Sequence, residues 1–253
     1  MKKRKFKLLK KDDLRFILLG SGYHICYLAE LLIKKKFPKP IIVTQKLKNH
    51  RRDIKLMKAG NLYKNIFKIA EKYKLELIAS DNCNDINIIN KIKKSGNMVF
   101  SLSCRNILKR NFLKSFKYVF NIHPSYLPEE KGGGTFSWRI MNNSKEVSAT
   151  IHIVNEKIDG GDILFQSKEI IKKNNLLPYD YLVKTNLLYK KLLYKFVINI
   201  IKEKFFNLKK QNKKKATYYP RLNTEKNGII DWSWNIYQIE RFIRAFSHPY
   251  PGC

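Results

Sequence analysis

Short apolar segments alternate with amphipathic segments along the first hundred residues, and this alternation restricts the fold more than any other feature. The apolar segments occupy 15–19, 40–44, 75–79 and 98–102. Segments with helical spacing of apolar residues lie between them, at 25–33, 62–73 and 86–95. Strands that alternate with helices form parallel sheets covered on both faces. We therefore predict an α/β fold with a mostly parallel sheet, helices on both faces, and ligands beyond the carboxyl ends of the strands.

The second half of the chain divides less evenly. Residues 163–170 form a further expected strand, and a long amphipathic helix is expected from about 178 to 206. We expect a basic N-terminal tail at 1–14, a main domain at 15–208 and a polar linker at 209–216. The remaining residues, 217–253, read as the start of a truncated C-terminal segment that contains a helix at about 236–245.

The charge of the chain is strongly unbalanced, with 52 Lys and Arg against 20 Asp and Glu and a net charge of +32. Such a surface attracts RNA, nucleotides or anionic cofactors, yet the basic residues are spread along the whole chain, which also fits compositional drift. Four cysteines without CxxC spacing indicate neither a metal site nor a disulfide framework. No apolar segment approaches the roughly 20 residues of a membrane helix, and we expect a cytoplasmic protein without membrane partners.

The segment 121–162 carries the most specific chemistry in the chain. Asn121 and His123 alternate as at the end of a strand, so their side chains project to the same face. Asp159 stands in a Gly-rich turn, where a carboxylate close to an imidazole would orient it and raise its pKa. An amide and a protonated imidazole can both donate to an oxyanion, so these three groups favour acyl transfer to an amine.

A loop rich in Pro and Gly follows His123. We expect its residues to stay non-helical and to let the backbone approach a substrate closely. This expected substrate loop contains Ser125, Gly132, Gly133 and Gly134.

The segments NIHPSYLP, KGGGTFSWRIMNNSKEVSATIHIV and KIDGGDILFQ together resemble the folate-dependent formyltransferases. The resemblance extends from about Arg15 onward and includes GIIDWSWNIYQIERFIRAFSHPYPG near the C-terminus. It implies a Rossmann-like domain that uses 10-formyltetrahydrofolate as the formyl donor, without a metal. By the same resemblance Asn121, His123 and Asp159 fall on the catalytic positions of the family. The expected folate-binding residues are Ser103, Cys104, Arg105, Asn106 and Ile158.

The acceptor amine is not fixed by the resemblance, which covers enzymes acting on methionyl-tRNA, on a ribonucleotide and on nucleotide-linked amino sugars. The positive charge and the basic segment 45–55 favour tRNA. The end of the chain at Cys253, and a GGGTFSW segment that departs from the loop of the tRNA enzymes, favour a nucleotide-linked amino sugar, which we expect. Two alternatives remain: a non-catalytic relative that binds folate or RNA, and a basic RNA-binding protein.

Overall fold

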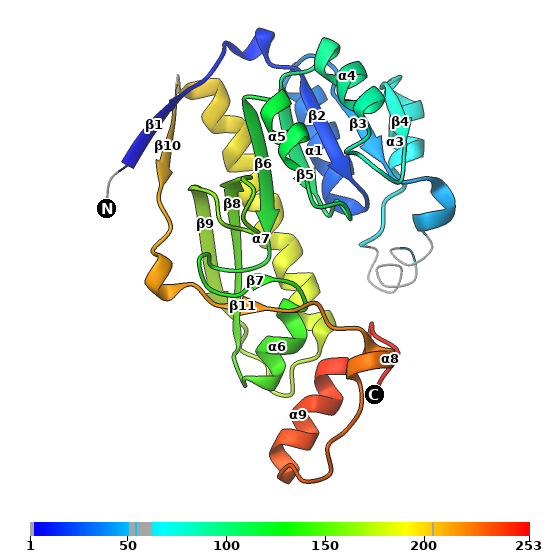
Figure 1. The fold of residues 1–253 in the computed structure, drawn as a ribbon, viewed down its shortest axis with the longest axis vertical. Helices are drawn as coiled ribbons and strands as arrows, with labels where there is room; N and C mark the ends of the chain where they lie inside the picture. Colours follow the sequence, from blue (N-terminus) through cyan, green and yellow to red (C-terminus); the bar gives the residue numbers. More distant parts are fainter. Residues whose placement is uncertain (1–2, 51–53, 55–61, 204) are drawn as a thin grey trace.

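The computed structural model describes residues 3–50, 54, 62–203 and 205–253. Within these residues nine strands form one sheet in the order β1-β10-β9-β8-β6-β5-β2-β3-β4 (Figure 1). The five strands from β6 to β4 are parallel, and every pairing from β6 through β8 to β1 is antiparallel. The predicted α/β fold is confirmed, and the alternating first hundred residues account for most of its parallel part.

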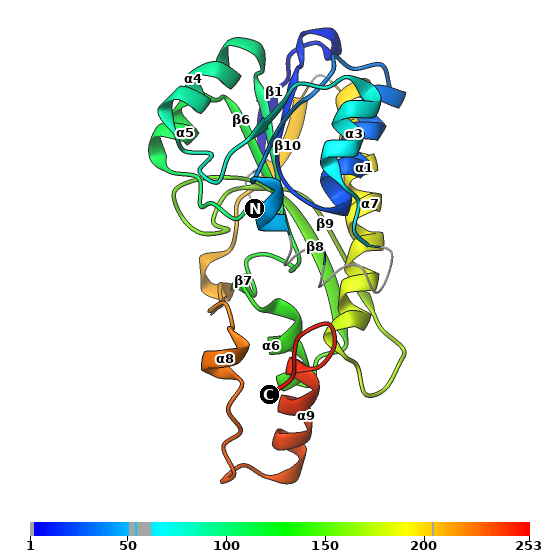
Figure 2. The same cartoon turned by 90° about the vertical axis from the view of Figure 1, so that its right-hand side faces the viewer.

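The parallel part matches the expected elements closely. Its strands are β2 (Phe16–Gly20), β3 (Ile41–Thr44), β4 (Leu77–Ala79), β5 (Met98–Leu102) and β6 (Tyr118–His123). Its connecting helices are α1 (Tyr23–Lys34), α3 (Ile66–Tyr73), α4 (Ile86–Ser95) and α5 (Arg110–Ser115). Helices α1 and α3 lie on one side of the sheet with α7 (Pro178–Lys202), and α4 and α5 lie on the other (Figure 2).

Strand β2 shows why both faces of the sheet are covered. Its side chains alternate, so Phe16 and Leu18 belong to the core under α1 and α7, while Ile17 and Leu19 belong to the core under α4 and α5. All four are fully buried. A strand that is apolar at every position therefore predicts a central position in the sheet.

The antiparallel part contains the main departures from expectation. Its strands are β8 (Glu146–Ile153), β9 (Ile163–Ile170), β10 (Phe205–Lys209) and β1 (Lys3–Lys7). Part of the segment expected as a basic tail is thus an edge strand, paired with β10. The helix that was expected to reach about residue 206 ends at Lys202. Phe206 and Leu208 are core residues, but they belong to strand β10 and not to the helix.

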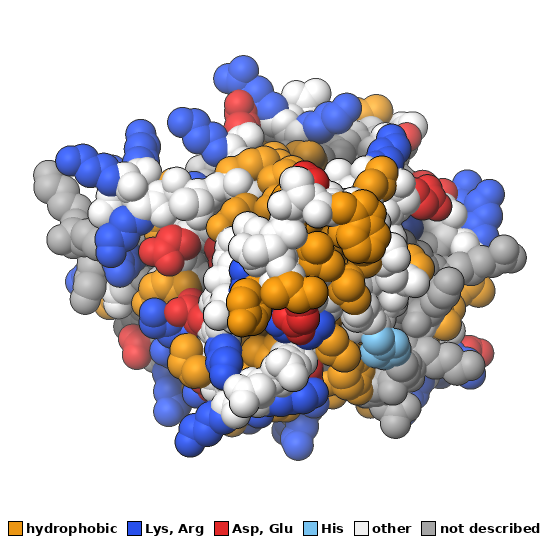
Figure 3. Space-filling view, turned by 90° about the horizontal axis from the view of Figure 1, so that it is seen from below, with side chains coloured by type: hydrophobic (Ala, Val, Ile, Leu, Met, Phe, Trp, Pro, Cys, Tyr) orange, Lys and Arg blue, Asp and Glu red, His pale blue; other side chains and the backbone are white. Residues whose placement is uncertain are grey.

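The C-terminal segment packs against the loop that follows β6. Its short strand β11 (Tyr218–Tyr219) pairs with β7 (Lys131–Gly132), and α9 (Ile236–Phe246) packs on α6 (Thr135–Met141); the short helix α8 (Thr224–Asn227) lies between β11 and α9. Phe242 and Phe246 are buried in that contact. Apolar side chains gather on this end of the molecule (Figure 3), and the large exposed apolar residues of the segment are Tyr218, Ile229, Trp232, Ile236, Tyr237 and Ile243.

Short 3-10 turns occur at Lys11–Asp13, Leu47–His50 and Lys213–Lys215. The basic segment 45–55, which the sequence singled out for tRNA, falls partly outside the described residues, at 51–53 and 55. Within the described ranges no helix combines the length and apolar character that crossing a bilayer requires.

Candidate active site

The carboxyl end of β6 holds the first two expected residues of the site. The antiparallel pairing of β6 with β8 sets Asn121 opposite His152 and His123 opposite Thr150. The Asn121 amide nitrogen lies 3.2 Å from Nε2 of His152. His123 is 5% exposed, so its ring is almost completely enclosed at the edge of the sheet.

Asp159 reaches this strand end from the turn between β8 and β9. Its φ of +46° places it in the left-handed region, which is uncommon for a residue other than glycine. Its carboxylate lies 3.5 Å from Nδ1 of His123 and 3.5 Å from Nε2 of His152, one oxygen to each ring. The backbone N–H of Gly132 donates to the same carboxylate at 3.0 Å. The structure therefore brings the three predicted residues together and adds His152.

The environment of Asp159 stabilises its ionised form. Burial opposes ionisation, but hydrogen bonding to His152, the charges of both imidazoles and the Gly132 N–H more than offset it and lower the pKa to about 2. Asp159 is therefore negatively charged at every pH near neutrality.

The environment of His123, in contrast, favours the uncharged form of its side chain. Burial lowers the pKa of His123, and the Asp159 charge and the Glu130 carbonyl only partly oppose that effect. The resting ring is therefore neutral near pH 7. Its Nε2–H donates to the backbone carbonyl of Glu130 at 2.9 Å, which leaves Nδ1 facing Asp159.

His152 is a residue of the site that sequence reasoning missed. Its Nδ1 donates to the Ile153 carbonyl at 2.8 Å, so Nε2 is the atom that faces the other groups. Nε2 can accept from Asn121 or, when protonated, donate to Asp159, but it cannot do both at once. In the neutral ring one hydrogen of the Asn121 amide is used in this contact, and the second hydrogen remains able to donate to a substrate.

A buried ion pair supports the carbonyl that binds His123. Arg139, which is 1% exposed, donates from Nε to the Glu130 carboxylate at 2.8 Å and from Nη2 to Ser148 at 2.7 Å. Glu130 has a φ of +54°, and its N–H donates to the Thr217 hydroxyl at 2.8 Å. These contacts fix the strained residue whose carbonyl orients the imidazole.

Gln211, in the segment that was expected to be a linker, forms hydrogen bonds with the turn that contains Asp159. The Gln211 amide donates to the carbonyls of Asp159 and Gly161, each at 2.7 Å. Gly161 itself lies so close to β8 that an added Cβ would fall 1.8 Å from the Ile153 carbonyl oxygen. Gln211 therefore contributes to the site, although nothing in its local sequence indicates it.

The expected substrate loop contacts other parts of the chain. Ser125 is fully buried and donates to the Glu129 carbonyl at 2.8 Å. Gly132 has a φ of +95°, and an added Cβ would meet the Tyr219 carbonyl oxygen at 2.3 Å. Gly133 and Gly134 similarly face Arg221 and the Trp138 side chain. The absence of side chains at these glycines thus allows the C-terminal segment to pack closely against the loop. Contact of the glycines with a substrate stays a prediction.

Four of the expected folate-binding residues, 103–106, directly follow the carboxyl end of β5. Cys104, Arg105 and Asn106 line a cavity of about 180 Å³, and the Asn106 side chain binds the Cys83 N–H and the Asp81 carbonyl. The hydrogen bond with Cys104, together with burial, raises the pKa of the Cys83 thiol. Ser103 has a φ of +60° and is exposed. Ile158 is 47% exposed on the turn that carries Asp159.

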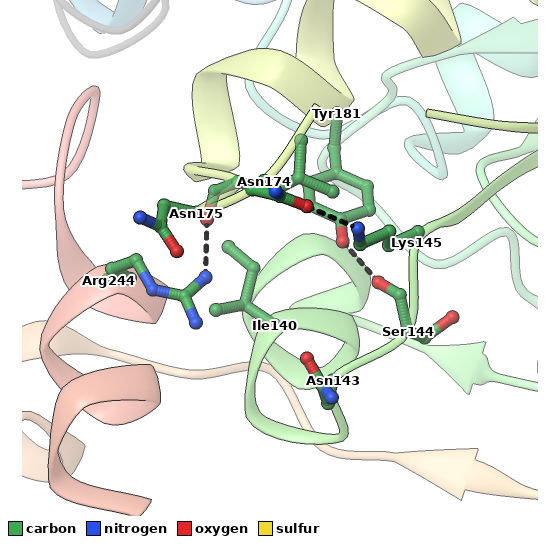
Figure 4. A pocket seen from close by; sticks show the side chains of 9 residues that line it. Ile140, Asn143, Ser144, Lys145, Asn174, Asn175, Tyr181 and Arg244 are labelled. Atoms are coloured by element: carbon green, nitrogen blue, oxygen red, sulfur yellow. Dashed lines mark hydrogen bonds between the residues drawn. The ribbon is translucent and has the colours of Figure 1, made fainter. Parts of the chain in front are cut away.

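Two further cavities differ in their relation to the site. One of about 280 Å³ is lined by Asn121, Ser103 and Cys104 together with residues of α1, α6 and α7. Another, of about 370 Å³, lies between α6, α7 and α9 (Figure 4). Its polar walls are joined to each other, since Lys145 donates to Asn174 at 2.7 Å and Arg244 donates to the Leu176 carbonyl at 3.0 Å. Of these two cavities, the first has Asn121 in its lining.

Two family models match the chain. The model described as formyl transferase matches residues 34–178, and the model of the formyl transferase C-terminal domain matches residues 223–253. A curated relative, the bifunctional polymyxin resistance protein ArnA of Wigglesworthia glossinidia brevipalpis, is 29% identical over 199 residues. That match covers 75% of this chain and 29% of the relative, so the chain spans less than a third of that protein.

Solved structures share the fold. The sugar 3N-formyltransferase WlaRD, crystallised with dTDP and 5-N-formyl-THF, has a TM-score of 0.71 at 23% identity over 92% of this chain and 79% of its own. An N-formyltransferase from Helicobacter canadensis, with folinic acid and dTDP-3-aminofucose, has a TM-score of 0.70 at 24% identity over 92% and 80%. Methionyl-tRNA formyltransferase from Clostridium thermocellum has a TM-score of 0.59 at 15% identity over 94% and 86%.

Proposed function

This chain belongs to the formyl transferase family, and we propose that it transfers the formyl group of 10-formyltetrahydrofolate to the primary amine of a nucleotide-linked amino sugar. The observation that carries this proposal is the meeting of Asn121, His123 and Asp159 at the carboxyl end of β6, with Asn121 on the wall of a cavity. The dTDP and folate compounds in the sugar formyltransferase structures support the choice of acceptor and donor.

The reaction replaces one C–N bond by another. Bound 10-formyltetrahydrofolate supplies a formyl carbon on N10. The acceptor amine attacks that carbon with its lone pair, and the carbonyl electrons move to oxygen. When the oxyanion collapses, the bond to N10 breaks, N10 gains a proton and the amine loses one. The protein must therefore stabilise an oxyanion and move a proton.

Asn121 is the group placed to stabilise the oxyanion. Its amide keeps one N–H for this purpose while the other is held by His152. Removing a single donor of this kind costs roughly 10²–10³ in rate.

His123 and Asp159 are placed to handle the proton. Burial keeps His123 neutral before the reaction, and Nε2–H is bound to the Glu130 carbonyl, so Nδ1 is the atom that takes the proton that the amine loses. The imidazolium that forms lies 3.5 Å from the ionised Asp159, which stabilises its charge. Nδ1 then passes that proton to N10 as the bond between the formyl carbon and N10 breaks.

The residues at the end of β5 fit a flat, partly apolar donor such as a pterin. Cys104, Arg105 and Asn106 line a cavity of about 180 Å³, and Ile158 offers exposed apolar surface on the turn of Asp159. We place folate binding at Ser103, Cys104, Arg105, Asn106 and Ile158 on this basis.

Methionyl-tRNA is the second candidate acceptor, favoured by the net charge of +32. A tRNA acceptor predicts activity that falls steeply with added salt, because each phosphate contact releases counterions. A nucleotide-linked sugar has two phosphates at most and predicts a much weaker dependence on salt.

The proposal is tested by the release of tetrahydrofolate from 10-formyltetrahydrofolate. The acceptor panel holds dTDP- and UDP-linked 3- and 4-amino sugars beside initiator methionyl-tRNA, with the His123→Ala variant as control. We expect turnover with one amino sugar, lost in the variant. Turnover with methionyl-tRNA alone would contradict the sugar acceptor, and turnover that survives His123→Ala would contradict the site.

A further inference from the structure

Two thiols that take no step in the proposed reaction lie together at the carboxyl ends of the parallel strands. Cys83 stands in the turn between β4 and α4, and Cys104 follows β5. Both line the cavity of about 180 Å³, whose walls also include the ends of β2 and β3. Cys83 is buried in the core under α4 and α5, and Cys104 packs against that core. Two separate segments of the chain thus bring one thiol each to the same cavity.

The two thiols are in hydrogen-bond contact, and both are free. The Cys83 S–H donates to the sulfur of Cys104, and the backbone N–H of Asn106 donates to the same sulfur. These hydrogen bonds lower the pKa of the Cys104 thiol, although burial opposes them. The hydrogen bond that Cys83 donates, together with burial, raises its own pKa. Cys104 is therefore the sulfur that carries the negative charge when one of the pair ionises.

Asparagine side chains hold the two segments side by side. Asn106 accepts the Cys83 N–H at 3.1 Å and donates to the Asp81 carbonyl at 3.1 Å. In the other direction Asn84 makes two hydrogen bonds, of 3.1 Å and 2.8 Å, to backbone groups just beyond Asn106. Two cysteines can form a disulfide without large backbone movement only when their chain segments already lie close together. The four hydrogen bonds provide that proximity.

The two sulfurs differ in their access to a small oxidant. Cys104 is partly exposed and also lines the neighbouring cavity of about 280 Å³, whereas Cys83 is 3% exposed. Thiolate character and access together decide which cysteine an oxidant attacks. Cys26 provides the contrast, because it is fully buried and burial raises the pKa of its thiol to about 12. An oxidant should therefore react at Cys104 and leave Cys26 unchanged.

We propose that Cys83 and Cys104 form a redox pair, which a peroxide closes into a disulfide at the wall of this cavity and a thiol reductant opens again. The Cys104 thiolate attacks one oxygen of hydrogen peroxide, the O–O bond breaks, and Cys104 becomes a sulfenic acid while hydroxide leaves. The Cys83 sulfur then attacks the Cys104 sulfur, the S–O bond breaks, and the departing hydroxide takes the Cys83 proton as water. Two thiols and one peroxide thus give one disulfide and two water molecules.

The disulfide changes the walls of the cavity. The two sulfurs must move from hydrogen-bond contact to covalent contact, which draws the segment 103–106 toward the turn before α4. That segment contains four of the residues at which we place folate binding, so this consequence rests on the proposed function. The disulfide should therefore weaken the binding of folate.

Mass spectrometry of the full chain tests the pair without any ligand. The protein is treated with hydrogen peroxide, unfolded in N-ethylmaleimide to block its free thiols, and digested with trypsin, which cleaves at the lysines between the two cysteines. We expect a disulfide-linked Cys83–Cys104 peptide that dithiothreitol abolishes, with Cys26 recovered as a blocked free thiol. The pair is overturned if Cys104 links only to Cys253, is oxidised further without linkage, or stays reduced while the exposed Cys253 reacts.

A cysteine variant separates the two steps. In Cys83→Ser the sulfenic acid on Cys104 has no partner, so it should persist and react with dimedone, which should label wild type far less. Cys26→Ser is the matched control and should give the same linked peptide as wild type. Equal dimedone labelling of wild type and Cys83→Ser would contradict the role of Cys83. Should Cys83→Ser fail to fold, the wild-type digest still decides the proposal.

Folate affinity tests the consequence for the cavity. The probe is 5-formyltetrahydrofolate, and its affinity is measured for reduced and oxidised wild type after the peroxide has been removed. We expect oxidation to weaken binding by about fivefold or more and dithiothreitol to restore it. Cys104→Ser, whatever its own affinity, should not respond to peroxide. An affinity that the disulfide leaves unchanged would overturn the effect on folate binding.

The redox pair and the proposed function fail in different ways. If the linked peptide forms but no acceptor releases tetrahydrofolate, the proposed function is wrong and the redox pair stands. If turnover occurs but Cys104 never links to Cys83, the redox pair is wrong and the proposed function stands.

Discussion

The Asn121 amide nitrogen lies 3.2 Å from Nε2 of His152, its direct partner across the pairing of β6 and β8. This contact orients the Asn121 amide, which serves as a donor in the proposed reaction, and the Ile153 carbonyl holds His152 in turn. In the proposed reaction His152 is therefore a positioning residue that acts through Asn121.

We predict that His152→Ala lowers kcat by about tenfold to a hundredfold, less than the roughly 10²–10³ expected when the Asn121 donor itself is removed. The amide would keep its chemistry but lose its fixed orientation. The comparison requires kcat and both KM values for His152→Ala and Asn121→Ala. His248→Ala, in the C-terminal segment, is the matched control, and equal activity of His152→Ala and His248→Ala would contradict the role.

The ion pair of Glu130 and Arg139 leads to a prediction about stability. Arg139→Met should destabilise the fold by about 3–5 kcal/mol, because it leaves the Glu130 carboxylate without its buried partner. The double variant Glu130→Gln with Arg139→Met should recover part of that loss. Urea unfolding of the two variants measures both effects. A double variant less stable than Arg139→Met would contradict this explanation.

Gln211 offers a test of the turn that carries Asp159. Gln211→Ala removes two hydrogen bonds to the carbonyls of Asp159 and Gly161. We expect kcat to fall by about tenfold, as for a residue that keeps a catalytic group in place. Gln211→Glu, which loses the amide donor at nearly the same size, should behave like Gln211→Ala. Full activity in both variants would show that the turn holds its shape without Gln211.

The low pKa of the buried His24 side chain predicts that the stability of the protein depends on pH. Its pKa of about 3 in the folded protein lies below the unfolded value of 6.5, so the unfolded state binds a proton that the folded state does not. This contribution is complete above pH 6.5 and is lost as the pH falls toward 3. His24 alone should therefore reduce the free energy of unfolding by about 2 kcal/mol between pH 7.5 and pH 5.

Urea unfolding at the two pH values measures this change, with His24→Leu as the comparison. Lys190, Tyr23 and Tyr189 are the charged or titratable neighbours of the ring, and burial raises the pKa of Tyr189. His123, whose pKa is also lowered by burial, adds a dependence of the same sign that stays in the variant. An unchanged pH dependence in His24→Leu would contradict a neutral, buried His24.

The sequence predicted the parallel part of the fold well, because each of its elements shows its own periodicity. The helix at 86–95 and the strand at 98–102 agree residue for residue with α4 and β5. The antiparallel part was less predictable. Phe205 and Phe206 continue the apolar pattern of the helix, and only pairing with β1 and β9 makes that segment a strand.

The residues of the candidate site were also predictable only in part. Alternation along β6 is enough to place Asn121 and His123 on one face, and the turn with two glycines marks Asp159. His152 requires the register between β6 and β8, and Gln211 requires a contact across about fifty residues of chain. Neither relation has a local signal, so both residues were missed.

The central claim is that Asn121, His123 and Asp159 form a formyl-transfer site whose acceptor is a nucleotide-linked amino sugar. Tetrahydrofolate release with dTDP-3-aminofucose and the other amino sugars, compared between wild type and His123→Ala, tests it most directly. We predict turnover with one of these sugars and a loss of at least a hundredfold in the variant. Equal rates in the two proteins, or formyl transfer to methionyl-tRNA alone, would contradict the account.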